Sequence, residues 1–254
     1  MKENRMSEFE LDGRVAVVTG GGQGIGEGIA KVYAQRGAAV VVAARHADRI
    51  QRVADEITAA GGRAIAVQTD VTDRAALEAL AGAAVNTYGS LDIWVNNAGG
   101  SSVRTPLRNL ETTDWDSCIA VNLTAVWVAS VIAADRMNGS GVIINVTSPA
   151  AERAAPGSGH YSAAKAGVNA LTRTMSVELA PDIRVNGIAP GYVPTEVMMT
   201  ALDMDVPALE RMAESRIPMK RLGTPDDIAA AAVYLASDAG AWVTGQTLTV
   251  SGGL

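Results

Sequence analysis

A tyrosine and a lysine four residues apart, Tyr161 and Lys165, are suited to acid–base chemistry. If residues 162–180 are helical, both side chains project from one face of the helix. A free phenol has a pKa of about 10, and bringing it to about 7 requires roughly 4 kcal/mol. An ammonium about 4 Å away supplies on the order of 4 kcal/mol at an effective dielectric constant of about 20. The pair is therefore predicted to act as a general acid/base, with Lys165 lowering the pKa of Tyr161.

A serine, Ser148, lies 13 residues before the tyrosine, directly after the apolar run Val142–Thr147. Strand ends meet at the carboxyl edge of a parallel sheet, where binding sites form. A hydroxyl there would hydrogen-bond a substrate oxygen beside Tyr161. Each residue also has a structural interpretation: an interface tyrosine, a solvated lysine, a serine cap. A second cluster decides between them.

Six glycines fall within the nine residues 20–28. They follow the apolar run 15–19 and open the segment 24–36, which has helical spacing, so they mark a strand-to-helix turn. Free backbone N–H groups and the positive end of a helix dipole bind phosphate there, and absent side chains let a pyrophosphate approach. The spacing is T-G-x-x-x-G-x-G over residues 19–26 rather than G-x-G-x-x-G. A dinucleotide site is predicted; a turn without a ligand is the alternative.

Strand-like and helix-like segments alternate along the chain. Runs rich in β-branched residues predict strands at 15–19, 39–43, 64–68, 93–96, 142–147, 184–189 and 247–250. They are apolar almost throughout, as is typical of parallel strands covered on both faces. The order predicts an α/β fold, a Rossmann-like doubly wound parallel sheet of about seven strands with helices on both faces. Thr224, Pro225 and Asp227 predict a capped helix start.

Composition excludes several classes of protein. Of 254 residues 48% are hydrophobic and 19% charged, which supports a sizeable core, and a net charge of −6 argues against nucleic-acid or membrane partners. Residues 1–10 lack the apolar stretch of a signal peptide, and the apolar run 228–236 is too short to span a bilayer, so a cytoplasmic protein is expected. The lone Cys118 excludes an internal disulfide. With His46 and His160 scattered, no metal site is expected. A surface role is favoured for His160, and contact with the pocket is the alternative because it adjoins Tyr161.

Five motifs in order make the chain resemble the short-chain dehydrogenase/reductase family. They are the glycine pattern at 19–26, Asp70-Val71, Asn96-Asn97-Ala98-Gly99, Tyr161-x-x-x-Lys165 and Pro190-Gly191. The resemblance covers roughly residues 11–253. It implies an NAD(P)-dependent oxidoreductase that interconverts a secondary alcohol and its ketone, most often as a homotetramer. We therefore expect a single dinucleotide-binding and catalytic domain over 1–254, a flexible tail at 1–10 and a substrate lid at about 192–217.

The same resemblance implies roles for individual residues. Tyr161 would exchange the proton, Ser148 would orient the substrate oxygen, Lys165 would also hold the cofactor ribose, and Asn122 would fix a water that relays protons. Asn122 has apolar sequence neighbours, so a buried side chain there needs partners. The expected cofactor contacts are Gly20, Gln23, Gly24, Ile25, Gly26, Arg45, Asp70, Val71, Asn97, Ala98, Gly99, Tyr161, Lys165, Pro190, Gly191, Val193 and Thr195.

The end of the second strand bears on the choice of cofactor. Ala44 stands where NAD-preferring relatives have Asp, and Arg45 follows it with a guanidinium suited to a 2′-phosphate. NADP(H) is therefore predicted. Many NADP-using relatives place a basic residue where this chain has neutral Gln23, so use of NAD(H) stays open.

The substrate is less constrained. Four methionines in the lid segment, at 198, 199, 204 and 212, favour a lipophilic ketone or alcohol, although core packing explains them equally well. Bacterial hydroxysteroid dehydrogenases are similar in the segment 148–152 and in the tail from Trp242. A 3-oxoacyl-[acyl-carrier-protein] reductase is the alternative, weakened because residues 138–140 and 181–182 lack basic side chains. A non-catalytic dinucleotide sensor or scaffold is the alternative of another class, and a nucleotide-sugar dehydratase or epimerase a further enzymatic one.

Overall fold

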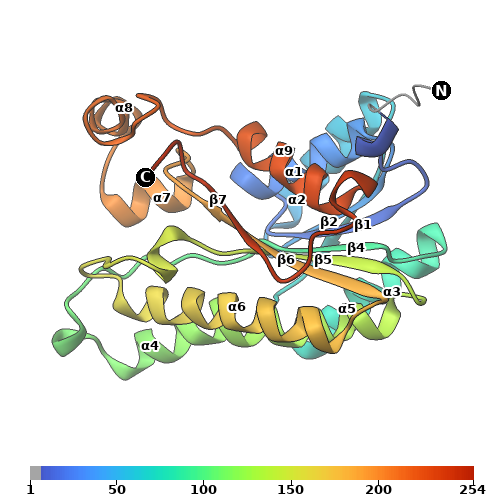
Figure 1. Ribbon diagram of the computed structural model, residues 1–254, viewed down its shortest axis with the longest axis horizontal. Coiled ribbons are helices and arrows are strands. Elements are labelled where there is room, and N and C mark those ends of the chain that lie inside the picture. Colours follow the sequence, from blue (N-terminus) through green and yellow to red (C-terminus); the bar gives the residue numbers. More distant parts are fainter. Residues whose placement is uncertain (1–6) are drawn as a thin grey trace.

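The computed structural model describes residues 7–254, in which seven parallel strands form one sheet (Figure 1). The strand order is β3-β2-β1-β4-β5-β6-β7. The strands are β1 (Val15–Thr19), β2 (Ala39–Ala44), β3 (Arg63–Gln68), β4 (Ile93–Asn96), β5 (Gly141–Val146), β6 (Ile183–Pro190) and β7 (Thr247–Val250). The predicted doubly wound parallel sheet is confirmed.

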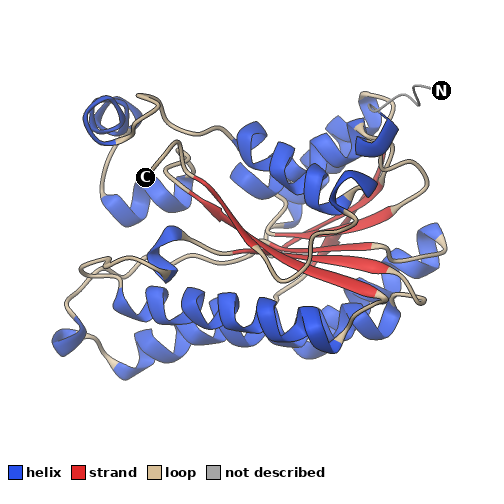
Figure 2. Cartoon of the chain, in the orientation of Figure 1, coloured by secondary structure: helices blue, strands red, loops and turns tan. Residues whose placement is uncertain are grey.

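Helices cover both faces of this sheet (Figure 2). One layer contains α1 (Gly24–Gln35), α2 (Ala47–Ala59) and α9 (Pro225–Ala236), and the other contains α3 (Arg74–Tyr88), α4 (Thr112–Ile119), α5 (Ala125–Arg136) and α6 (Gly159–Glu178). Two further helices, α7 (Glu196–Leu202) and α8 (Val206–Arg216), lie outside these two layers.

Strand residues alternate between two apolar cores. On β1, Ala16 and Val18 belong to the cluster that contains Ile29 of α1. Val17 belongs to the opposite cluster, with Leu77 of α3. Both kinds of position are apolar because both faces are covered, which explains the nearly continuous apolar runs.

The chain reverses its direction of winding between β1 and β4. It runs outward from β1 to β3 and then returns to β4 on the other side of β1. Val18 accordingly pairs with Val42 of β2 and with Val95 of β4. In open parallel sheets such a reversal leaves a crevice at the carboxyl ends of the strands, where ligands bind.

Residues Thr112–Arg136 form one continuous helical stretch that is long and apolar enough to cross a membrane, by length and composition alone. Its Ala129, Ile132 and Ala133 are buried in the core against α3, so we interpret it as a core helix. A π-helical turn, Ala120–Thr124, interrupts it. Such turns are common at functional sites, and this one contains Asn122.

Two segments lie outside the layered core. Of the tail expected at residues 1–10, residues 1–6 lie outside the described part of the chain. Ser7–Phe9 form a 3-10 turn, and Phe9 packs against the core rather than belonging to a flexible tail. The expected lid, 192–217, contains α7 and α8, and α7 has no buried residue.

Candidate active site

The predicted site residues gather at the carboxyl edge of the sheet. The positions expected to contact the cofactor lie in five segments there: Gly20, Gln23, Gly24, Ile25 and Gly26 after β1, Arg45 after β2, Asp70 and Val71 after β3, Asn97, Ala98 and Gly99 after β4, and Pro190, Gly191, Val193 and Thr195 at and after β6. Val193 is 3% exposed and packs into the core, so its side chain has a structural role. The others lie in turns at the carboxyl ends of the strands, the edge at which the reversal between β1 and β4 predicts a crevice.

The glycine turn is locked against the turn that follows β4. Gly20 has a φ of +64° and Gly24 a φ of +57°, a region that favours glycine. The Asn97 side chain donates from Nδ2 to Thr19 O at 2.9 Å and to Gly20 O at 3.2 Å. A Cβ on Gly26 would collide with Gly20 O and Asn97 Nδ2. These contacts explain glycine at positions 20 and 26 by close packing of the turn itself.

The start of α1 fits a dinucleotide phosphate. Its N-cap, Gln23, makes no side-chain capping hydrogen bond, so the first-turn N–H groups keep their capacity for an anion. The Gln23 Oε1 atom is buried without a hydrogen-bond partner among residues 7–254. Buried polar atoms without a hydrogen-bond partner are rare in native proteins. The unpaired Gln23 oxygen therefore fits a site at which a bound group would supply the partner.

At the far end of the crevice, Arg45 and Asp70 follow neighbouring strands. Thr72 donates to Asp70 Oδ1 from its N–H at 2.9 Å and from its hydroxyl at 2.7 Å. These hydrogen bonds, followed by the charge of Arg45, lower the pKa of Asp70. Asp70 is therefore held as a carboxylate near Arg45; its contact with the cofactor stays a prediction.

Tyr161, Lys165 and Ser148 are brought together by α6 and the end of β5. The Lys165 ammonium lies over the Tyr161 ring, 5.7 Å from its centroid, and donates to Val146 O at 2.8 Å. Ser148 Oγ accepts from Ala150 N at 3.2 Å and also interacts with the Tyr161 hydroxyl. Ser148 thus has the capping role that was considered as the structural alternative, and it also lies beside the phenol; its hydrogen bond to a substrate oxygen stays a prediction.

The pKa values differ from the simple expectation. Burial raises the pKa of Tyr161 to about 12, although hydrogen bonding with Ser148 opposes the rise. Burial also lowers the pKa of Lys165 to about 8. The prediction that Lys165 brings the pKa of Tyr161 to about 7 was wrong for the protein without a bound cofactor. It considered only the attraction between the two groups and left out the cost of burying both. The phenol is therefore held protonated at neutral pH.

Asn122 is fully buried and locks the turn after β4. Its Oδ1 accepts from Gly100 N at 2.8 Å, and its Nδ2 donates to Gly100 O at 2.9 Å and to Cys118 O at 3.0 Å. A Cβ on Gly99 would lie 2.6 Å from Asn122 Oδ1 and 3.5 Å from Lys165 Nζ. Asn122 has the partners that a buried amide requires, and it faces the same turn as the lysine. Its role in holding a water stays a prediction.

His160 was wrongly assigned to the surface. It is 0% exposed, and its Nε2 lies 2.8 Å from Ser101 Oγ, while its Nδ1 is buried without a partner among the described residues. It therefore connects the loop after β4 to the first turn of α6, one residue before Tyr161. Adjacency to Tyr161 was the only sequence signal for this contact.

The burial of Lys165 predicts a pH-dependent contribution to stability. Its pKa falls from 10.5 to about 8 on folding, so between these values the unfolded chain binds more protons than the folded one. The free energy of unfolding therefore rises with pH across this window, by up to about 3 kcal/mol. Urea unfolding of the wild type and of Lys165→Met, from about pH 7.5 to about pH 10, measures the rise. We expect the variant to lose it.

Tyr161 makes the free energy of unfolding fall as the pH rises, but it does so above the pH range of this experiment. Its raised pKa contributes stability that is lost between pH 10.0 and about 12. Lys220→Met, which removes an exposed lysine, is the matched control and should keep the rise. Equal pH slopes for the wild type and Lys165→Met would contradict the burial argument.

Within residues 7–254 no group of three or more His, Cys, Asp or Glu side chains is arranged to hold a metal ion. The acid–base cluster instead consists of a phenol, an ammonium and a hydroxyl. These groups can bind an oxygen atom and move a proton to or from it.

Comparison with known proteins is consistent with this geometry. Residues 20–254 match a family model described as enoyl-(acyl carrier protein) reductase. The 7alpha-hydroxysteroid dehydrogenase of Escherichia coli strain K12 is 42% identical over 248 residues, 96% of this chain and 95% of that protein. A solved 7 alpha-hydroxysteroid dehydrogenase complexed with NADH and 7-oxo glycochenodeoxycholic acid has a TM-score of 0.92 and 40% identity, covering 99% of this chain and 98% of its own. A gluconate 5-dehydrogenase from Burkholderia cenocepacia in complex with NADP and tartrate has a TM-score of 0.91 and 37% identity, covering 98% of each chain.

Proposed function

The chain belongs to the short-chain dehydrogenase/reductase family and is an NAD(P)-dependent oxidoreductase acting on CH–OH groups, and we propose that Tyr161 is the general acid/base of its reaction. The observation that carries the proposal is the meeting of Tyr161, Lys165 and Ser148 at the carboxyl edge of the sheet. This edge also carries the glycine turn suited to a dinucleotide.

Each side chain has a distinct task in ketone reduction. The Ser148 hydroxyl donates a hydrogen bond to the substrate oxygen and holds it beside the phenol. Tyr161 donates its proton to that oxygen as the carbonyl becomes an alcohol. The Lys165 ammonium, whose pKa burial lowers to about 8, is a proton source suited to restoring the phenol. When bound, the nicotinamide supplies the hydride, or accepts it in the oxidative direction.

We propose that NADP(H) is the preferred dinucleotide. Arg45 is exposed at the end of β2, where its charge also lowers the pKa of Asp70, and Ala44 beside it carries no carboxylate to repel a 2′-phosphate. Solved relatives bind NADH in one case and NADP in another, so the local residues carry this proposal.

Ala44→Asp is expected to lower the ratio of kcat/KM with NADPH to kcat/KM with NADH by about tenfold or more, because a carboxylate repels the 2′-phosphate. Steady-state kinetics with both cofactors measure the ratio. Ala60→Asp adds the same charge at the other end of α2 and should leave the ratio unchanged. A ratio that does not fall in Ala44→Asp would contradict the proposed phosphate site.

We propose a lipophilic, hydroxysteroid-like substrate. In the lid, Met199, Met204 and Ala208 line an open hollow of about 550 Å³ together with the polar Thr200, Asp203 and Asp205. Methionine adapts to irregular apolar shapes. A panel of lipophilic cyclic ketones and alcohols, with NADPH and NADH in parallel, tests the proposal through the absorbance of the reduced cofactor.

A 3-oxoacyl-[acyl-carrier-protein] reductase is the second candidate, favoured by the 37% identity over 250 residues to the 3-oxoacyl-[acyl-carrier-protein] reductase FabG of Chlamydia pneumoniae. The stretches Asn138–Ser140 and Pro181–Asp182 bring no basic side chain to meet an acidic carrier. A 3-oxoacyl carrier-protein substrate therefore belongs in the same panel. Its preference over every cyclic ketone would replace the lipophilic-substrate proposal, and turnover of any member excludes a non-catalytic sensor.

We further propose that the protein is cytoplasmic and self-associates, as a homotetramer. Trp127 of α5 is 50% exposed, Val177 of α6 is 77% exposed, and Trp242 before β7 is 99% exposed. Large apolar side chains at such exposures are typical of surfaces that meet another chain.

A further inference from the structure

The start of α7 lies across the crevice predicted to hold the dinucleotide. A Cβ added to Gly24 would lie 2.8 Å from Thr195 Cγ2, and one added to Gly100 would lie 2.6 Å from Val197 Cγ1. Residues 195–197 therefore contact the glycine turn on one side and the turn after β4 on the other. The first turn of α7 spans the mouth of the site between them.

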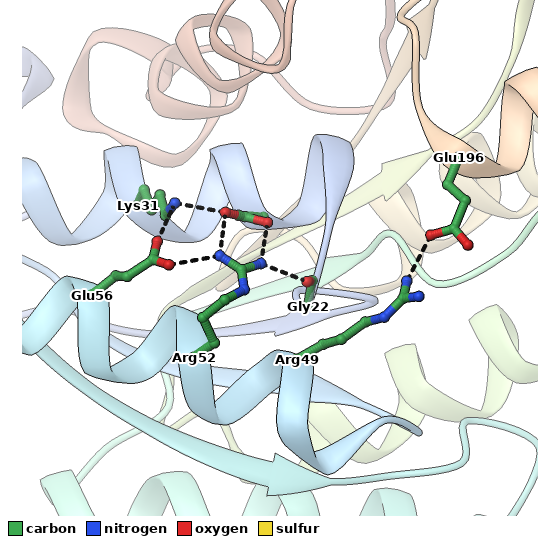
Figure 3. A network of polar contacts seen from close by, with 7 residues as sticks. Gly22, Lys31, Arg49, Arg52, Glu56 and Glu196 are labelled. Carbon is green, nitrogen blue, oxygen red and sulfur yellow. Dashed lines mark hydrogen bonds and ion pairs between the residues drawn. The ribbon is translucent and has the colours of Figure 1, made fainter. Parts of the chain in front are cut away.

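One ion pair fastens this turn to the body of the protein. Arg49 Nη1 of α2 lies 2.7 Å from Glu196 Oε2, the first residue of α7, as Figure 3 shows. A Cβ on Gly22 would lie 3.1 Å from Arg49 Cβ, so the arginine starts beside the glycine turn. The two side chains are 38% and 62% exposed. The pair joins the cofactor-binding half of the chain to the lid.

The arginine side of the pair is firmly anchored. Arg52, on the same helix, donates from Nη2 to Gly22 O at 3.2 Å and pairs with Glu27 at 2.8 Å and with Glu56 at 2.8 Å (Figure 3). Lys31 of α1 pairs with both of these glutamates. Helices α1 and α2 and the glycine turn are thus cross-linked into one unit.

Apart from the contacts of Thr195 and Val197 with the two turns, the glutamate side of the pair has few buried contacts. Helix α7 has no buried residue, and its N-cap Thr195 accepts only from Met198 N, at 3.2 Å, within the same turn. Segments with few buried contacts open most readily. Among residues 7–254, the Arg49–Glu196 pair is the one salt bridge between α7 and the rest of the protein, and it adds to those packing contacts.

We propose that Arg49 and Glu196 are positioning residues whose ion pair holds the first turn of α7 closed over the bound dinucleotide and slows its release. The inference rests on the proposed function only in placing the dinucleotide beneath this turn. Exposed ion pairs of this kind change equilibria by about two- to fivefold. The effect is screened by salt.

The first test is the rate of dinucleotide release, followed by stopped-flow fluorescence for the full-length protein with NADPH and with NADH. We expect release to be about two- to fivefold faster in Arg49→Gln and in Glu196→Gln, with no further gain in the double variant. The charge-swapped variant, Arg49→Glu with Glu196→Arg, should recover part of the loss. Added salt should speed the release of NADH more in the wild type than in Glu196→Gln.

Two controls separate the ion pair from other effects. Asp238→Asn breaks an ion pair of similar length, 2.8 Å to Arg14, beside the amino end of β1, and should leave release unchanged. Glu196→Gln removes both the ion pair and the favourable interaction of Glu196 with the N-terminus of its own helix. Arg49→Gln removes only the ion pair, so it separates the two effects. An effect of Arg49→Gln with NADPH alone would indicate direct contact with the 2′-phosphate and would overturn the proposal.

The second test needs no dinucleotide. Hydrogen exchange of the α7 amides should be faster in both single variants than in the wild type. Unchanged exchange and unchanged release in Arg49→Gln and Glu196→Gln would overturn the proposal. Failure to bind either dinucleotide would overturn the proposed function and, with it, the claim that the ion pair slows dinucleotide release. The hydrogen-exchange rates would still show whether the ion pair holds α7 in place.

Discussion

Replacing Tyr161 with phenylalanine is expected to lower kcat by about a hundred- to ten-thousandfold, while the dissociation constant for the dinucleotide stays near the wild-type value. The substitution removes one oxygen atom and with it the proton that would pass to the substrate oxygen. The ring is retained, so the packing of Lys165 over it, 5.7 Å from the centroid, is expected to survive. Steady-state turnover and fluorescence titration with NADPH measure the two quantities.

The matched control is Tyr88→Phe, which removes a hydroxyl from a half-buried tyrosine at the end of α3, where Arg63 lies 5.8 Å from the ring centroid. It should retain full turnover. Turnover close to wild type in Tyr161→Phe would show that Tyr161 is not the proton donor. Loss of both turnover and cofactor binding would instead indicate a structural role.

Gly26→Ala is expected to weaken dinucleotide binding by about ten- to a hundredfold. The added Cβ would collide with Gly20 O and Asn97 Nδ2, so either the Gly20 peptide shifts or the two hydrogen bonds from Asn97 break. Both changes deform the turn that faces the predicted phosphate. Overpacking of a tight site costs about 1–3 kcal/mol, which corresponds to this range of affinity.

Gly82→Ala is the matched control for Gly26→Ala, since both glycines lie within helices. Gly82 lies within α3, and a Cβ there would meet no atom within 4 Å. Because alanine is the better helix former, this variant should bind the dinucleotide normally and gain up to about 1 kcal/mol of stability. Titration calorimetry with NADPH compares the two variants. Wild-type affinity in Gly26→Ala would contradict the assigned role of the turn.

The sheet could be predicted because its signals are local and repeated. Val15–Thr19 is a strand as predicted, and the run predicted at 142–147 forms β5 at Gly141–Val146. Thr224 and Asp227 form the predicted capping box, with Asp227 N donating to Thr224 Oγ1 at 3.2 Å. Tyr161 and Lys165 share one helix, which begins at Gly159, slightly before the predicted start. Apolar runs and caps need only a few neighbouring residues to be recognised.

The features that could not be predicted depend on residues distant in the sequence. The raised pKa of Tyr161 comes from burial by the folded chain, which the spacing to Lys165 does not reveal. The hydrogen bond between His160 and Ser101 joins residues 59 positions apart. The ion pair between Arg49 and Glu196 joins residues 147 positions apart. None of these contacts has a periodic signal.

The most direct test of the central claim is to follow the transferred hydrogen. A lipophilic ketone accepted in the panel is reduced with NADPH that carries deuterium at both C4 positions of the nicotinamide, and the alcohol is analysed by mass spectrometry and NMR. We predict one deuterium at the carbinol carbon in the wild-type product, and almost no product from Tyr161→Phe in the same time. Cofactor consumption without deuterium in the alcohol, or equal product from the variant, would contradict hydride transfer assisted by Tyr161.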